Sequence, residues 1–79
     1  MGIKMNEDLN QYRVKEIRSS NGIHKLGYLA EIVDEGSFYR IDGTHIIDKF
    51  RISSITIDGN QLTVHMKDRD IILIVEQKL

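Results

Sequence analysis

The chain contains no cysteine, no proline and no tryptophan among its 79 residues. Without cysteine it can form neither a disulfide nor a thiolate metal site, and a cysteine nucleophile is excluded. No run approaches the roughly 20 apolar residues that a membrane-spanning helix requires, and the first residues lack the apolar segment of a signal peptide. We therefore expect a cytoplasmic protein that does not bind membranes and needs no cofactor.

Neither sign of charge predominates, because the chain has 11 basic and 12 acidic residues and a formal net charge of −1. A protein that mainly binds phosphate groups usually has a clear basic excess. The first third of the chain is weakly basic, which is the one electrostatic indication of an anionic partner. A chain of this length buries only about 60% of its unfolded surface. We expect one small domain over residues 1–79 that shares surface with a partner.

Turn signals divide the sequence at nearly regular intervals. They are Asn21-Gly22, Glu35-Gly36, Asp42-Gly43, Asp58-Gly59 and the charged turn 67–70. Glycine after a polar residue supplies the positive φ that a tight hairpin needs. The intervening runs are rich in Ile, Val, Leu, Tyr and Phe, which is typical of antiparallel strands. The pattern predicts a mainly β fold, a small antiparallel barrel of about five to six strands.

The expected strands differ in how clearly they are marked. A polar lead over 6–11, with Asn6 as a possible N-cap, predicts a short helix or a frayed start. Gly27 predicts a bend or bulge within a long second strand. The segment 44–50 is ambiguous because Ile46 and Ile47 are adjacent. Apart from the ambiguous segment, the expected strands are 11–18, 23–33 (the long second strand), 37–41, 55–57, 62–66 and 71–75.

The last run is apolar on both faces. An outer strand of a monomer normally carries polar residues on one face. The run therefore lies in the middle of the sheet, covered on both sides, or its second face contacts another copy of the protein. We predict a homo-oligomer, with interface residues Ile71, Ile72, Leu73, Ile74 and Val75.

The stretch from Tyr12 to Ile57 resembles the Sm-like small barrels, such as the RNA chaperone Hfq and the C-terminal domain of RimP. The resemblance lies in the runs 21–29, 33–36, 41–43 and 46–53, which place glycines and acidic residues in similar turns. It implies an SH3-like barrel, and it leaves 58–79 as an extra C-terminal hairpin. It also implies that Lys49 occupies the position of an RNA-contacting lysine, while Phe50 replaces the family's histidine and Asp48 its tyrosine.

Aromatic and basic residues suggest a nucleic-acid surface, since bases stack on any aromatic face. Because strand residues alternate, Phe38 and Arg40 share one face, and we expect them to be exposed while Tyr39 packs inside. Aromatic side chains in a sheet are also common core and cross-strand partners. The candidate nucleic-acid residues are Lys49, Phe50, Arg51, Phe38, Arg40, Arg13 and Lys15, with Arg18 on the same basic strand as the last two.

No motif predicts catalysis. His24, His45 and His65 lack the close spacing of zinc ligands, and the acidic residues fall mainly in turns, where Asp is favoured for bonding its own backbone. The sequence predicts a non-catalytic β-barrel binding module that self-associates and binds a protein partner. The alternative is an Sm-like regulator that binds RNA or DNA.

Overall fold

A computed structural model describes residues 9–78 as a succession of strands with two short 3₁₀ turns. The turns are η1 (Leu9–Gln11) and η2 (Lys49–Arg51). The strands are β1 (Tyr12–Ser19), β2 (Gly22–Asp34), β3 (Phe38–Ile41), β4 (His45–Asp48), β5 (Ile52–Asp58), β6 (Gln61–Met66) and β7 (Asp70–Gln77).

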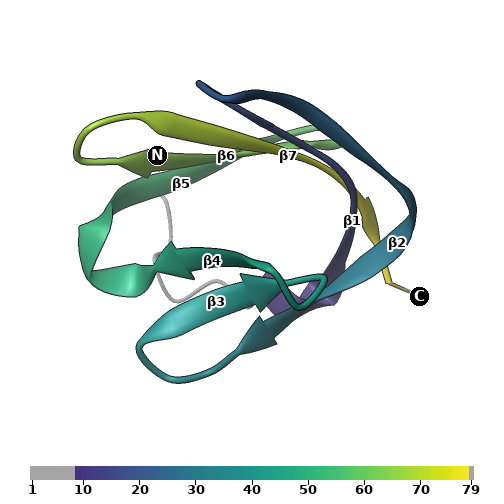
Figure 1. Cartoon of the computed structure of the whole chain (residues 1–79), viewed down its shortest axis with the longest axis horizontal. Coiled ribbons are helices and arrows are strands. Elements are labelled where there is room, and N and C mark those ends of the chain that lie inside the picture. Colours follow the sequence, from purple (N-terminus) through teal and green to yellow (C-terminus); the bar gives the residue numbers. More distant parts are fainter. Residues whose placement is uncertain (1–8, 79) are drawn as a thin grey trace.

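The strands form one antiparallel sheet in the order β4-β3-β2-β1-β7-β6-β5. Figure 1 shows this sheet curled into a half-barrel, with β3 and β4 facing β5, β6 and β7 across the interior. The expected small, mainly β fold is confirmed, whereas the expected five to six strands are wrong, because residues 9–78 form seven. The sheet also does not close, since β4 and β5 are its two edges and η2 joins them.

The ambiguous segment 44–50 contains both a strand and a turn. β4 ends at Asp48, whose side chain accepts a hydrogen bond of 2.9 Å from the backbone N–H of Phe50. This cap turns the chain out of the sheet. At the other end, the described residues contain η1 in place of an α-helix, and its Leu9 is buried. The expected cap at Asn6 lies outside the described residues.

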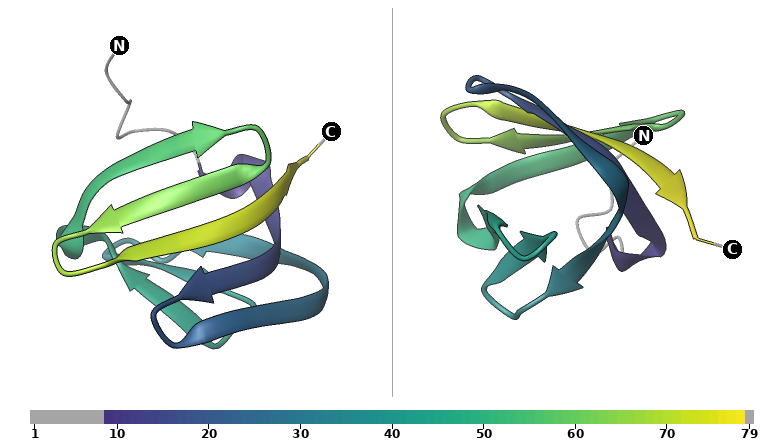
Figure 2. Two further views of the ribbon diagram at one scale, coloured as in Figure 1. Left: turned by 90° about the horizontal axis from the view of Figure 1, so that it is seen from above. Right: turned by 45° about the vertical axis from the view of Figure 1, so that its right-hand side comes forward.

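The bend in β2 occurs where the sequence predicted it. Gly27 has a φ of +77°, a conformation that glycine adopts without steric cost. The pairing of β1 with β2 shifts register between Val14 and Glu16. β2 pairs with β1 on both sides of this bend, at residues 22–25 and 30–31, and with β3 at residues 32–34. Figure 2 shows it passing from one layer of the half-barrel to the other.

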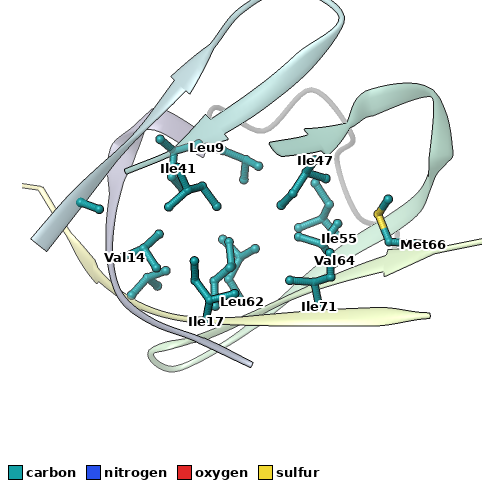
Figure 3. Packing of buried hydrophobic residues seen from close by; sticks show 14 residues of the cluster. Leu9, Val14, Ile17, Ile41, Ile47, Ile55, Leu62, Val64, Met66 and Ile71 are labelled. Atoms are coloured by element: carbon teal, nitrogen blue, oxygen red, sulfur yellow. The ribbon is translucent and has the colours of Figure 1, made fainter. Parts of the chain in front are cut away.

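The interior is filled by aliphatic side chains from both layers (Figure 3). β7 lies between β1 and β6, in the middle of the sheet, as one of the two alternatives for this run stated. Its Ile71, Leu73 and Val75 are buried, while Ile72 and Ile74 are half-buried on the outer face, so the second face is not fully covered within residues 9–78. The buried apolar residues are Leu9, Val14, Ile17, Ala30, Ile32, Ile41, Ile47, Ile55, Leu62, Val64, Met66, Ile71, Leu73 and Val75.

Because β7 buries only one of its faces in the core, the interface predicted for the run 71–75 has to be revised. Three of the five residues in the run 71–75 are buried on the concave side of the sheet, so they do not lie on the outer face that another copy would cover. The other two lie beside the Glu16 and Arg18 positions of β1, which pair with Ile74 and Ile72. Because Glu16 and Arg18 form an ion pair, the outer face of β7 is bordered by a charged pair on its β1 side.

Candidate functional site

The residues predicted to bind nucleic acid form separate groups. Arg13 and Lys15 lie on β1, where each meets a carboxylate. Arg13 Nε lies 3.0 Å from Glu31 Oε2, and Lys15 Nζ lies 3.2 Å from Glu76 Oε2. Hydrogen bonds from Lys78 and then Arg13 lower the pKa of Glu31. The charge of this strand is therefore already balanced within the protein.

The second group is η2, in which three neighbouring residues have different surroundings. Lys49 Nζ lies 2.6 Å from Asp34 Oδ1 and 4.7 Å from the ring centre of Tyr39. The hydrogen bond to Asp34 raises the pKa of Lys49, and the same bond lowers the pKa of Asp34. Phe50, in contrast, is 77% exposed, and Arg51 is exposed beside it. Phe50 and Arg51 are thus available to a partner, whereas Lys49 is engaged.

Phe38 and Arg40 form the third group, on the outer face of β3. The Arg40 guanidinium lies 5.7 Å from the ring centre of Phe38 and 3.2 Å from Glu35 Oε2. Both residues are half-buried, so the exposure predicted for this pair is found only in part. Tyr39 is half-buried as well, and it packs against the core. Lys49 reaches β3 from the Tyr39 side, so it does not join Phe38 and Arg40.

Register places two aliphatic residues beside this pair. Arg40 pairs with Val33 on one side and with Ile46 on the other, and these two side chains are 45% and 58% exposed. We call Val33, Phe38, Arg40 and Ile46 the outer patch. Sequence reasoning did not select Val33 or Ile46, although the adjacent Ile46 and Ile47 require one of them to face outward from a strand.

Three cations near η2 carry no ion pair within residues 9–78. They are Arg51, Lys67 and Arg69, and all three are exposed. The backbone N–H of Lys67 donates to the Arg51 carbonyl at 3.0 Å, so the β6–β7 turn lies against η2. Lys67 and Arg69 were not predicted as site residues, because no local pattern brings residues 67–69 next to residue 51.

A pocket of about 130 Å³ opens between the two layers. Its lining includes Ile41 and Ile47 of one layer and Ile17 and Ile71 of the other, all labelled in Figure 3. We call this pocket the mouth pocket. Its lining comprises Ile17, Ser19, Asn21, Ile41, His45, Ile46, Ile47, Arg69, Ile71 and Leu73.

The β3–β4 turn fixes one side of this pocket. Asp42 Oδ1 accepts hydrogen bonds from the Thr44 hydroxyl at 2.6 Å and the Thr44 backbone N–H at 3.2 Å, and it lies 3.2 Å from His45 Nδ1. These contacts, the Thr44 hydroxyl first, lower the pKa of Asp42 to about 2. The ring centres of His45 and His24 lie 5.5 Å apart. The sequence did not predict this pairing of two histidines.

Residues 9–78 contain no group of three or more His, Cys, Asp or Glu residues placed to hold a metal ion. No helix in the same range is long and apolar enough to cross a membrane.

Searches for related proteins identified no relative of this chain. Comparisons with protein-family models, with curated proteins and with solved structures gave no match. The resemblance to Sm-like barrels stays a prediction from the turn motifs.

Asp42→Asn tests the carboxylate that holds the β3–β4 turn. Asp42 has a φ of +51°, which asparagine tolerates well, so the backbone should keep its shape. We expect a loss of about 1 to 2 kcal/mol in the free energy of unfolding at pH 7. The folded pKa of about 2 lies below the ordinary 3.8, so this contribution is present above pH 4. It disappears as the pH falls toward 2.

Urea unfolding of both proteins at pH 7 and at pH 2 measures this difference. Asp68→Asn, in the exposed β6–β7 turn, is the control for removing one negative charge. A difference between wild type and Asp42→Asn that is the same at both pH values would contradict the assigned role of the charge.

Proposed function

We propose that the chain is a non-catalytic binding module that self-associates and binds a protein partner through the outer patch. The observation that carries this proposal is the 58% exposure of Ile46 on an edge strand. Large apolar side chains grouped with few charges mark protein contact surfaces. The Asp34 and Asp42 carboxylates are held by turn and ion-pair contacts, which favours a binding role over acid–base chemistry.

The strand that carries Ile46 adds a second feature. β4 has β3 as its one neighbour in the sheet, so the backbone groups on its other side have no strand partner within residues 9–78. An unpaired edge is a template for another strand, from the same or a different chain. Ile46 and the 77% exposed Phe50 lie at and just after this edge, so backbone pairing and apolar contact can act together.

The outer face of β1 and β7 is less suited to contact with a partner or a second copy of the chain. Arg13, Lys15 and Arg18 are each paired with a glutamate there, and Ile72 and Ile74 are already half-buried. A partner on this face would desolvate these ion pairs and gain little apolar area in return. This comparison moves the proposed interface from the run 71–75 to β4.

Ile46→Glu tests the proposed self-association. Because the Ile46 side chain is exposed, the folded subunit should tolerate the change. A charge at the interface should weaken association at least tenfold. The matched control is Ile23→Glu, because Ile23 is 61% exposed on the outer face near β7. Sedimentation velocity measures the state of wild type and both variants.

We expect wild type and Ile23→Glu to associate and Ile46→Glu to sediment as a monomer. Dissociation by Ile23→Glu alone would assign the interface to the β7 face instead. A wild-type protein that stays a monomer throughout would refute self-association.

A second candidate function is binding of single-stranded nucleic acid. It is favoured by one observation, the position of the exposed Phe50 next to Arg51 and Lys67, which have no ion pair within residues 9–78. An aromatic face beside unpaired cations matches the way single strands are bound, by stacking and backbone attraction. The strand of Arg13 and Lys15 takes no part in this version, because its charges are paired.

The salt dependence of oligonucleotide binding tests this second function. With three phosphate contacts, affinity for a mixed single strand should fall roughly tenfold or more between 50 and 200 mM salt. Phe50→Ala and Arg51→Ala should each weaken binding, while the control Arg13→Ala should not. Fluorescence anisotropy measures all four proteins. Equal loss with Arg13→Ala, or no binding at low salt, would exclude this site.

A further inference from the structure

The mouth pocket combines an apolar interior with a cation at its rim. Ile17, Ile41, Ile47, Ile71 and Leu73 supply the aliphatic wall, and they come from β1, β3, β4 and β7. Ser19, Asn21, His45 and Arg69 supply the polar part. We propose that this pocket binds a carboxylate that carries a short branched aliphatic tail. The proposal goes beyond the proposed function and does not depend on it.

The size of the pocket limits the tail. Its volume is about 130 Å³, and an apolar cavity of about 150 Å³ is known to hold benzene. A branched group of four or five carbons is therefore the largest that fits with little strain. A wall of isoleucine and leucine side chains offers such a group close contacts and no polar atoms.

The charge of the lining selects the head group. Arg69 is the charged residue of fixed sign in the lining, which contains no Asp or Glu. Its side chain has no ion pair within residues 9–78, and a guanidinium presents a planar fork that matches a carboxylate. Ser19 and Asn21 add hydrogen-bond donors nearby. Asp42, in the turn before the lining residue His45, is already engaged by Thr44 and His45.

Two kinds of ligand combine a carboxylate with a branched aliphatic tail. One is a free branched carboxylic acid, and the other is the carboxyl end of a peptide whose last residue is aliphatic. His45, Ile46 and Ile47 of the pocket belong to the edge strand β4. A peptide end could therefore pair along β4 while its last side chain enters the pocket.

The test is an NMR titration of the full-length protein with 4-methylpentanoate. A ligand of this size should saturate at about millimolar concentration and shift the amide signals of Ile47, Ile71 and Leu73. The uncharged 4-methylpentanamide tests the head group, and acetate tests the tail. Both should bind at least tenfold more weakly than 4-methylpentanoate.

Two variants separate the pocket from general attraction to positive charge. Arg69→Gln should weaken 4-methylpentanoate binding at least tenfold. Lys67 lies in the same turn but does not line the pocket. The Lys67→Gln variant should therefore bind 4-methylpentanoate with the affinity of wild type. Equal binding of the acid and the amide, equal loss in both variants, or no saturable shift would overturn the proposal.

Short peptides ending in leucine identify the source. Tighter binding of a free-ended peptide than of 4-methylpentanoate would support a chain end as the ligand, and equal or weaker binding would support the free acid. A peptide with an amidated end that binds as well as the free-ended one would contradict the carboxylate site. The self-association measured by sedimentation is a separate readout, so the two proposals can fail independently.

Discussion

The pairing of β7 with both β1 and β6 is the interaction on which the rest of the structure depends. It joins the N-terminal strands to the C-terminal hairpins, so that one sheet curls around one interior. Ile71, Leu73 and Val75 lie on the concave side of this strand and are buried. Removing the pairing would leave two smaller sheets, each with an uncovered apolar face. The buried apolar residues within 9–78 form one cluster, and a domain this small has little other buried area to compensate for such a loss.

The position of β7 also determines which surfaces are available. Because β7 lies beside β1, β5 is left at an edge, and the half-barrel stays open between β5 and β4. On the β1 side of the convex face, Arg13, Lys15 and Arg18 are each held in an ion pair with a glutamate. Around β4, η2 and the β6–β7 turn, exposed Ile46 and Phe50 lie near Arg51, Lys67 and Arg69, which have no ion pair within residues 9–78. The proposed contact surface and the mouth pocket both lie in this region.

Local patterns in the sequence predict the strands but not their neighbours. Polar–glycine pairs such as Asp58-Gly59 mark the turns, and Gly27 marks the bend in β2. No local pattern predicts the hydrogen bond between Lys15 and Glu76, which lie 61 positions apart in the sequence. The same limit applies to the site residues. Arg13 and Lys15 were selected by residue type, and the glutamates that pair with them come from β2 and β7.

Native-state hydrogen exchange tests the central place of β7 most directly, because amides in a strand paired on both sides open only with the whole sheet. We predict that the amides of Leu73 and Val75 are among the slowest to exchange, and that those of β4 exchange much faster. Exchange of the β7 amides at the rate of the β4 amides would contradict this role of β7, since it would place the strand at an edge of the sheet.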